Sequence, residues 1–429
     1  MRIAVIGLGY VGLCSGVGLA LKGNEVVGVA TTEEKAALIN GGKIPIYEEA
    51  LEESLKACLK GNSFRATSGL ASAVASSSAT FICVGTPSAS DGSIDLAQMK
   101  SASESVGAAL KKTGEYHVVV VKSTVIPGTT EDEIVPILER QSGKKSRKHF
   151  GVAMNPEFLR EGKALSDFLH PDRVVVGTGD KKAAEMLRKV YADFGAPIIE
   201  TGIREAEMIK YASNAFLATK ISFINELGNL CKKLGIDTYK VAEGMGLDKR
   251  IGKHFLQAGI GWGGSCFPKD VKALIAKSRE EGARMKIMED VVDVNASQRK
   301  LVIEMLKKKV PLGGKKIAIL GIAFKPGTDD MREAPAIDII KHLQAEGALV
   351  QAYDPKAGDN ARRLLLDVNC HASARDALKG ADACLILTDW PEFAELTDKD
   401  FALMKNKIII EGRRILDPKK VGGYEGICW

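Results

Sequence analysis

The chain lacks an apolar run long enough to cross a membrane, and it lacks paired cysteines that would bind a metal. Its eight cysteines and six histidines are scattered along 429 residues, with no CxxC pair and no regular cysteine–histidine spacing, so no zinc-site pattern is present. No segment approaches the roughly 20 apolar residues of a membrane span, and the first residues are typical of a strand rather than a signal peptide. We therefore expect reduced thiols, no metal, no membrane association and a cytoplasmic location.

A strong excess of charge of either sign is also absent. The net charge of +6 is small for this length, and the basic residues are dispersed, so no nucleic-acid partner is expected. The hydrophobic share of 45% and the charged share of 27% are typical of an ordinary folded protein. Because 429 residues exceed what one hydrophobic core supports, two or three domains are expected.

A dinucleotide-binding pattern opens the chain. The apolar run at 1–6 leads directly into the glycine turn GLGYVG at 7–12 and then a helix of small residues, which is the order of the Rossmann fingerprint. GxGxxG alone is a weak signal, but further strand-like runs at 25–29, 80–84 and 117–121 support a parallel sheet. Ligands of such sheets lie at the carboxyl ends of the strands. The loops at 85–87 and 122–124 are therefore candidate cofactor loops.

The last third of the chain repeats this alternation of strands and helices. Strand-like runs at 315–321 and 348–354 flank a predicted helix at 334–346. The loop at 322–330 has no GxGxxG, so we expect it to bind something other than a second dinucleotide. The stretch between the two αβ regions is interpreted as helical throughout. The predicted fold class is α/β, with two Rossmann-like αβ domains with parallel sheets (1–203 and 311–429) joined by a central helical domain (204–310) that contains a long helix.

That long helix, predicted at 205–234, has apolar residues around nearly its whole circumference. Such a helix is buried between domains or between subunits, and we favour a connecting helix that also makes a homodimer contact. Lys210 and Asn214 are four residues apart and share one face of it. A solvated lysine is the more common case, but apolar neighbours indicate a lysine that needs a polar partner inside a cleft, where its ammonium could hold an oxyanion.

Cys266 lies where a glycine-rich loop meets a predicted helix start. The loop glycines allow positive φ and close approach of a ligand, and Pro268 suits the first turn of a helix. Free N–H groups at the helix start, with Lys269 nearby, should favour the thiolate. Alternatively Cys266 is a small buried hydrophobe, as most lone cysteines are. Asp270, four residues later, is either a catalytic acid or only a first-turn acid of its helix.

The segment NPEFLREG at 155–162 predicts another helix start, with Asn155 as the N-cap and Pro156 as the first helical residue. Glu157 and Glu161 would then lie four residues apart on one face. They either favour the helix N-terminus electrostatically or form a pair that orients or deprotonates a water.

A dinucleotide fold and a cysteine thiolate together indicate a four-electron oxidation. Hydride loss from a primary alcohol gives an aldehyde, and a thiolate adds to the aldehyde to form a thiohemiacetal. A second hydride loss gives a thioester, which water hydrolyses to a carboxylate. The alternatives are a two-electron hydroxy-acid dehydrogenase, in which neither Cys266 nor the second αβ unit has a task, and a non-catalytic sensor that has kept the folds and lost turnover.

Nine motifs follow one another along the chain: GLGYVG at 7–12, VGTP at 84–87, KSTVIPGT at 122–129, NPEFLREG at 155–162, PDRVVVG at 171–177, KYASNAFLATKISFINE at 210–226, GWGGSCFPKD at 261–270, GIAFKPGTDDMRE at 321–333 and EGRR at 411–414. Together they resemble the UDP-glucose 6-dehydrogenase family of the UDP-glucose/GDP-mannose dehydrogenase superfamily. The match spans nearly the whole chain. PDRVVVG and NPEFLREG look more like the UDP-glucose branch than the GDP-mannose branch.

The resemblance implies oxidation of UDP-glucose at C6 to UDP-glucuronate with two NAD⁺, through a Cys266 thioester, in a homodimer or higher homo-oligomer. The implied catalytic residues are Cys266, Lys210, Asp270, Asn214, Glu157 and Thr124. The implied cofactor contacts are Gly7, Gly9, Tyr10, Val11, Gly12, Lys35, Thr86, Thr124, Glu161, Lys269 and Arg332. The implied substrate contacts are Phe158, Leu159, Arg160, Glu161, Lys210, Asn214, Gln257, Gly261, Trp262, Gly263, Phe324, Lys325 and Arg413, together with Arg250, which in the family reaches the substrate of the neighbouring subunit.

One position departs from the family. An aspartate that binds the adenosine ribose usually follows the second strand, and this chain has Ala30 there. Its absence weakens discrimination against a 2′-phosphate, so NADP becomes conceivable. No arginine follows to bind that phosphate, and Glu33 and Glu34 would repel it, although Lys35 could partly compensate. We expect NAD as the cofactor. The motifs leave the sugar epimer and any N-acetyl group open, so a UDP-N-acetylhexosamine or GDP-mannose dehydrogenase is an alternative.

Overall fold

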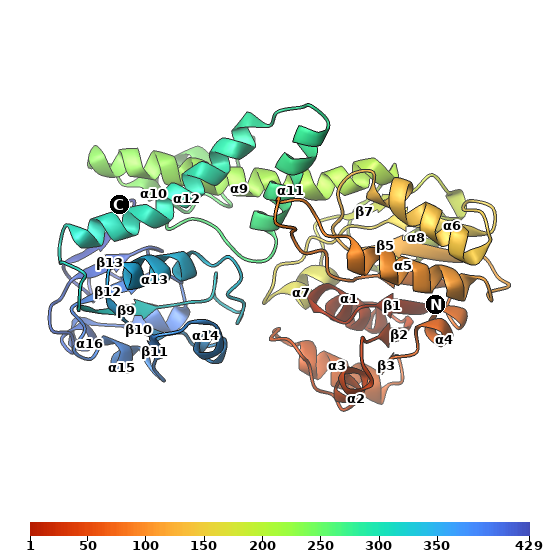
Figure 1. Ribbon diagram of the computed structural model, residues 1–429, viewed down its shortest axis with the longest axis horizontal. Helices are drawn as coiled ribbons and strands as arrows, with labels where there is room; N and C mark the ends of the chain where they lie inside the picture. The colour runs from red at the N-terminus through yellow and green to blue at the C-terminus, as the bar shows by residue number, and fades with distance from the viewer. The chain divides into compact units, whose positions relative to one another are not determined.

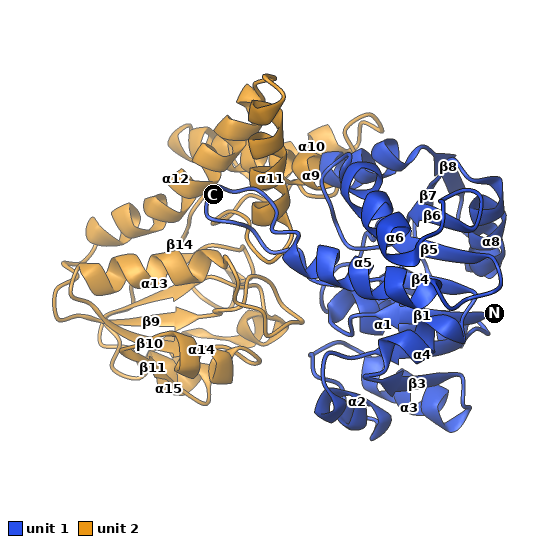
Figure 2. Cartoon of the chain, turned by 45° about the vertical axis from the view of Figure 1, so that its right-hand side comes forward, with its two compact units in different colours: residues 1–213 blue, residues 214–429 orange.

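The computed structural model describes all 429 residues and divides into two compact units, residues 1–213 and 214–429 (Figure 2). Each unit contains one sheet with helices packed against it (Figure 1). The predicted α/β class with two Rossmann-like sheets is confirmed. None of the helices combines the length and apolarity that a membrane crossing requires.

The first unit is built on an eight-stranded sheet. Its strands are β1 (Arg2–Ile6), β2 (Glu25–Val29), β3 (Phe64–Thr67), β4 (Ala79–Ile82), β5 (His117–Val121), β6 (Phe150–Met154), β7 (Val174–Gly177) and β8 (Ile198–Thr201). Its helices are α1 (Tyr10–Leu21), α2 (Glu33–Asn40), α3 (Leu51–Lys60), α4 (Leu70–Ala75), α5 (Ala97–Leu110), the π-helical turn η1 (Thr129–Ile134), α6 (Val135–Ser142), α7 (Ala164–Leu169), α8 (Lys181–Tyr191) and the 3₁₀ turn η2 (Ala192–Phe194).

The strand order β3-β2-β1-β4-β5-β6-β7-β8 begins with the six-strand Rossmann order. All neighbours are parallel except β6 and β7. The strands are short apolar runs rich in valine and isoleucine, as expected where helices cover both faces of a sheet. Ile6, Ile82 and Val121 are in register at the ends of β1, β4 and β5. The glycine turn and both candidate cofactor loops therefore leave the sheet at one edge.

The second unit has a six-stranded parallel sheet in the order β11-β10-β9-β12-β13-β14, the same winding as the first. Its strands are β9 (Lys316–Leu320), β10 (Leu349–Tyr353), β11 (Val368–Cys370), β12 (Ala383–Ile386), β13 (Ile409–Glu411) and β14 (Tyr424–Gly426). The helices are α10 (Thr238–Gly246), α11 (Phe267–Glu280), α12 (Lys286–Lys307), α13 (Pro335–Ala345), α14 (Gly358–Leu364), α15 (Ala374–Leu378), the 3₁₀ turn η3 (Pro391–Glu395) and α16 (Asp398–Phe401), and the long helix α9 (Ile203–Lys233) runs from the first unit into the second.

The prediction that the central stretch is helical throughout is wrong for residues 247–266, which form a loop between α10 and α11. Gly252, Gly261 and Gly264 have positive φ there, which a helix does not allow. Some of the loop's N–H groups are bound by side chains. Asn225 accepts from the Gly259 N–H at 2.8 Å, so the loop is held by α9 rather than by helical hydrogen bonds.

The apolar circumference of α9 is covered on only part of its surface within one chain. Tyr211, Ala218 and Ile224 are fully buried. Phe216 and Phe223 are 64% and 50% exposed, and Leu230, seven residues further on, is 52% exposed. An exposed apolar stripe at seven-residue spacing lies on one face of a helix, so burial of this face requires another molecule.

Candidate active site

Each glycine of the turn between β1 and α1 suits its position for a different geometric reason. Gly7 has a φ of +91°, and a Cβ there would lie 2.8 Å from the carbonyl oxygen of Cys83. A Cβ on Gly12 would lie 1.7 Å from the carbonyl oxygen of Gly7. A Cβ on Gly9, the N-cap of α1, would meet nothing within 4 Å. The first and third glycines are needed by the fold, whereas the second leaves room for a ligand such as a pyrophosphate to approach the helix N-terminus.

The other cofactor candidates of the first unit lie on the loops that follow its central strands. The Thr86 hydroxyl donates to the Thr124 carbonyl oxygen at 2.9 Å, so the loops after β4 and β5 are joined directly. Tyr10 and Val11 form the first turn of α1. Lys35 lies in the first turn of α2, where its N–H donates to the Thr32 hydroxyl at 3.2 Å. These residues fit a dinucleotide that lies across the carboxyl edge of the sheet.

The prediction of a helix that begins at Asn155 is wrong, because residues 155–160 have no regular secondary structure and α7 begins only at Ala164. Side chains bind the backbone N–H groups of this segment. Glu157 accepts from the Leu159 N–H at 2.5 Å. Asp167 accepts from the Arg160 N–H and also pairs with its guanidinium. Asn155 does not cap a helix, and Glu157 and Glu161 do not share a helical face.

Lys210 and Glu157 form a buried ion pair in the first unit. Lys210 Nζ lies 2.9 Å from Glu157 Oε1, and the two side chains are 3% and 6% exposed. Burial by itself raises the pKa of Glu157, but the charge and hydrogen bond of Lys210 outweigh it, so the pKa lies below its usual value. Lys210 Nζ also lies 5.5 Å from the ring centre of Phe158, and the Arg173 guanidinium carbon lies 3.7 Å from the same centre. The lysine is thus held over the segment that the resemblance assigns to substrate.

Two further residues of the 155–162 segment, Arg160 and Gly162, are bound by carboxylates outside the segment. Arg160 is engaged by Asp167, as described above. Glu161 is half-buried and precedes Gly162, whose N–H donates to the buried Glu48 carboxylate at 2.8 Å. Glu48 also accepts from the Ala164 N–H at 2.6 Å. Sequence reasoning missed Glu48, because a glutamate in a polar loop gives no sign that it binds backbone 114 residues further along the chain.

Cys266 is the N-cap of α11, and Pro268 is in the first turn, as predicted. Its side chain is partly exposed, and Sγ lies 3.6 Å from the Ser265 hydroxyl. Six of the other seven cysteines are buried. Burial raises the pKa of Cys83 and of Cys428 to about 12. Cys266 is therefore the thiol that combines access with a helix N-terminus.

Asp270 lies one turn after Cys266 on α11 and is 2% exposed. Asn214 Nδ2 donates to one carboxylate oxygen at 2.6 Å. Lys269 Nζ donates to the other oxygen, also at 2.6 Å. The structure thus brings together Asn214, Lys269 and Asp270 beside the cysteine-bearing turn, and the second unit contributes three of the six residues to which the resemblance gives catalytic roles.

The glycine loop before Cys266 is closely enclosed. A Cβ on Gly261 would lie 2.3 Å from the Asn295 side chain, and one on Gly263 would lie 2.2 Å from the Glu333 carbonyl oxygen. The N–H of Trp262 donates to Asn295 Oδ1 at 2.8 Å. Arg413 donates to the Gly261 carbonyl oxygen at 3.2 Å. The loop and Arg413 therefore form one rigid surface.

Two further candidates lie on the loop after β9. A Cβ on Gly264 would lie 2.7 Å from the ring of Phe324. Lys325 Nζ lies 5.4 Å from the centre of that ring. Phe324 and Lys325 thus adjoin the glycine loop within the second unit.

The same loop has its amides occupied by an acid of the second unit. The carboxylate of Asp354, which follows β10, accepts from the N–H groups of Ile322 and Ala323 at 2.7 and 2.9 Å. Trp390 Nε1 donates to the same oxygen at 3.1 Å. These are amides at the end of the first strand, where a Rossmann unit receives a pyrophosphate. Their occupation supports the expectation that this unit binds something other than a second dinucleotide.

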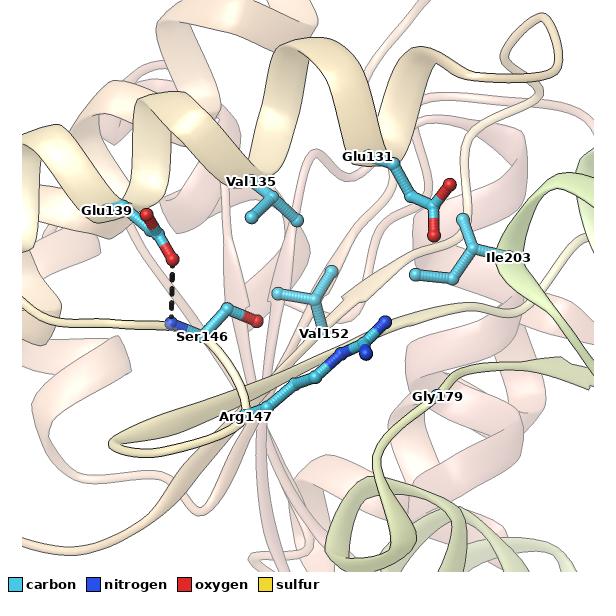
Figure 3. A pocket seen from close by; sticks show the side chains of 8 residues that line it. All are labelled: Glu131, Val135, Glu139, Ser146, Arg147, Val152, Gly179 and Ile203. Carbon is cyan, nitrogen blue, oxygen red and sulfur yellow. Dashed lines mark hydrogen bonds between the residues drawn. The ribbon is translucent and has the colours of Figure 1, made fainter.

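The side chains of two predicted residues pair with nearby acids, and a third predicted residue is exposed. The Arg250 side chain is 89% exposed and pairs with Asp248. Arg332 pairs with Asp330, and Gln257 is exposed. A cavity of about 280 Å³ in the first unit (Figure 3) is lined by residues such as Arg147 and Glu139. It contains none of the predicted site residues.

Three family models together match most of the chain. They describe the NAD binding domain (residues 1–195), the central domain (204–297) and the UDP binding domain (318–418) of the UDP-glucose/GDP-mannose dehydrogenase family. The UDP-glucose 6-dehydrogenase of Haloferax volcanii is 46% identical over 100% of both chains. That of Bacillus subtilis is 44% identical over 99% of this chain and 92% of its own.

Solved structures agree with these relatives. A UDP-glucose dehydrogenase from Pyrobaculum islandicum matches with a TM-score of 0.95 and 42% identity, over 100% of this chain and 97% of that one. A UDP-D-ManNAc dehydrogenase from Pyrococcus horikoshii matches with a TM-score of 0.88 and 31% identity, over 100% and 99% of the two chains. The protein is an NAD-dependent dehydrogenase, and the chain belongs to the UDP-glucose/GDP-mannose dehydrogenase family.

Proposed function

We propose that the protein oxidises UDP-glucose at C6 to UDP-glucuronate and that Cys266 carries the intermediate. The observation on which this depends is the placement of Cys266 as the accessible N-cap of α11, one turn from the buried Asp270. Helix N–H groups favour a thiolate at this position. UDP-glucose is proposed as the substrate because the full-length relatives are named UDP-glucose 6-dehydrogenases.

The proposed reaction consumes one alcohol, one water and two NAD⁺, and it yields one carboxylate, two NADH and three protons. NAD⁺, when bound, accepts a hydride from C6 in each of the two oxidations. Between them, Cys266 Sγ adds to the aldehyde carbon and the oxygen takes up a proton, which gives a thiohemiacetal. After the second oxidation C6 is a thioester, and water displaces the sulfur to leave the carboxylate and a thiol.

The remaining residues stabilise charge and place the water in this proposal. The Lys210 ammonium and the Asn214 amide hold the oxygen on C6 as negative charge develops on it. Asp270, bound by Asn214 and Lys269, assists the proton transfers. Glu157 accepts a proton from the hydrolytic water, because its lowered pKa keeps it an available base at neutral pH.

We further propose that the protein is a homodimer through the exposed stripe of α9. Phe216, Phe223 and Leu230 form that stripe, and exposed apolar patches of this kind mark protein interfaces. Arg250, whose side chain is 89% exposed and pairs with Asp248, would reach the sugar nucleotide of the second copy.

Counting NADH per sugar nucleotide tests the oxidation. UDP-glucose supplied in limiting amount with excess NAD⁺ should give two NADH for each molecule consumed. One NADH per molecule would indicate a two-electron dehydrogenase, and none would indicate a nucleotide-sugar sensor. Parallel reactions with UDP-N-acetylglucosamine, UDP-N-acetylmannosamine and GDP-mannose, each with NAD⁺ and NADP⁺, identify the sugar and the cofactor. Faster turnover of an N-acetyl sugar than of UDP-glucose would overturn the substrate assignment.

A further inference from the structure

A second buried lysine lies beside the Glu157–Lys210 pair and has no role in the proposed chemistry. Lys122 follows the last residue of β5 and is 3% exposed. Its Nζ donates to the Asn155 side-chain oxygen at 3.0 Å and to the Asn155 carbonyl oxygen at 3.4 Å. The ring centre of Phe168 lies 5.6 Å from the same nitrogen. Burying an ammonium is costly, so a lysine retained here requires an explanation.

Asn155 connects this lysine to the segment that carries Glu157. Its side-chain oxygen also accepts from the Tyr191 hydroxyl at 2.5 Å, and its Nδ2 donates to the Val175 carbonyl oxygen at 2.7 Å. Its N–H donates to the Val121 carbonyl oxygen at 2.9 Å. Every polar group of the Asn155 side chain is thus used. The residue ties the start of the 155–160 segment to β5, β7 and α8.

Titratable groups from three elements interact with Glu157. The charges of Lys210, on α9, and of Lys122, after β5, both lower the pKa of Glu157, and the neutral thiol of Cys83 follows β4. Burial lowers the pKa of Lys122 to about 8, against the opposing effects of Cys83 and Glu157. Lys210 pairs directly with the Glu157 carboxylate, whereas Lys122 binds Asn155 and acts on that carboxylate through its charge. Lys122 is largely protonated at neutral pH and adds to the attraction that keeps Glu157 ionised.

We propose that Lys122 is a positioning residue for the Glu157–Lys210 pair, because its buried ammonium fixes the Asn155 turn and holds the adjacent carboxylate in its charged form. This inference rests on the proposed function, in which Glu157 takes a proton from the hydrolytic water. Lys122 itself touches neither sugar nor cofactor in this role. Its removal should therefore change how turnover depends on pH more than it changes NAD binding.

The test compares four enzymes: wild type, Lys122→Met, Lys122→Gln and Lys122→Arg. Methionine has nearly the shape of lysine without its charge, glutamine keeps a hydrogen-bond donor without the charge, and arginine keeps the charge. We expect the acidic limb of the kcat profile to move up by about one pH unit in both neutral variants, because Glu157 ionises less readily. At pH 7, which lies above the acidic limb in every variant, kcat should change by less than about two-fold. The arginine variant should keep the acidic limb of the wild type.

The KM for NAD should change less than about two-fold in all variants that fold. Lys112→Met, which removes an exposed lysine near the end of α5, is the matched control and should leave the profile unchanged. A kcat that falls equally at every pH in the methionine and glutamine variants would overturn the proposal, since a merely structural role would act in this way. Failure of both neutral variants to fold, while the arginine variant folds, would also overturn it.

The two proposals fail in different ways. If wild-type enzyme does not convert UDP-glucose with two NADH per molecule, the proposed function fails before any Lys122 variant is compared. If wild-type enzyme does so and the acidic limb in Lys122→Met coincides with the wild-type limb, the positioning role alone fails.

Discussion

Lys210 Nζ lies 2.9 Å from the Glu157 carboxylate, and both side chains are almost completely buried. A buried ion pair of this kind contributes little net stability, because desolvation of the charges offsets their attraction. Its value lies in where it holds the two groups. The pair fixes a cation and a base together on α9 and the irregular 155–160 segment, where neither group needs to move during turnover.

Replacement of Glu157 by glutamine should slow hydrolysis much more than oxidation. We expect kcat to fall by about 100-fold, which is typical for loss of a general base. Because the thioester would then accumulate, mixing enzyme with UDP-glucose and NAD⁺ should give a rapid burst of two NADH per site before the slow phase. Stopped-flow absorbance measures both phases. Glu185→Gln, on the exposed face of α8, should behave as wild type, and a Glu157→Gln enzyme without a burst would contradict the assigned role.

The Cys266 variants separate chemistry from binding. Cys266→Ser should form no net carboxylate, because a serine hydroxyl is not ionised at neutral pH and adds poorly to the aldehyde. Cys266→Ala should bind the sugar nucleotide within about three-fold of wild type, since the contact of Sγ with the Ser265 hydroxyl, at 3.6 Å, is weak. Isothermal titration measures the binding, and chromatography of the products detects the acid. If the alanine variant no longer bound UDP-glucose, the thiol would be a structural group.

Gly9 and Gly12 of the cofactor turn should respond differently to replacement by alanine. Gly9→Ala should fold normally, because the added methyl group meets nothing within 4 Å, but it should raise the Kd for NAD at least about ten-fold by blocking close approach to the helix N-terminus. Gly12→Ala would place a methyl carbon 1.7 Å from the Gly7 carbonyl oxygen. We expect it to destabilise the first unit by roughly 3 kcal/mol. Thermal unfolding and NAD titration of the two variants distinguish these effects.

The elements that sequence predicted best are those whose signal is local. The strand–glycine–helix order at 7–12 and the helix start marked by Pro268 are set by residues within one turn of each other. The 155–162 segment was predicted wrongly because its local signal, an asparagine before a proline, was overridden by distant carboxylates. Glu48 binds its backbone from 114 residues earlier. The burial of Lys122 could not be predicted from the sequence either, because a lysine that follows an apolar strand gives no sign that it is buried.

The exposed stripe of α9 also shows a feature that the sequence alone does not predict. Apolar residues all round a helix predict burial, but not whether the cover comes from the same chain. Phe223→Glu should convert the proposed dimer to a monomer of 45.9 kDa, because Phe223 is 50% exposed at the centre of the stripe. Light scattering after gel filtration measures the mass. Leu364→Glu changes a residue that is 69% exposed away from the stripe and serves as the control; an unchanged mass in both variants would place any interface elsewhere.

Asp237 gives a prediction for stability against pH. Its carboxylate caps α10 through the Tyr239 N–H and pairs with the Arg414 guanidinium through both oxygens. The Arg414 hydrogen bonds lower the pKa of Asp237 from 3.8 to about 2. A pKa that is lower in the folded state stabilises the protein above pH 3.8, and this contribution is lost as the pH falls towards 2.

Asp237→Asn, which keeps an N-cap residue, should lower the free energy of unfolding by about 1 kcal/mol at pH 7, given partial exposure of the pair. Urea unfolding at pH 3 should show about half that difference, and a difference that grows in acid would contradict the assignment.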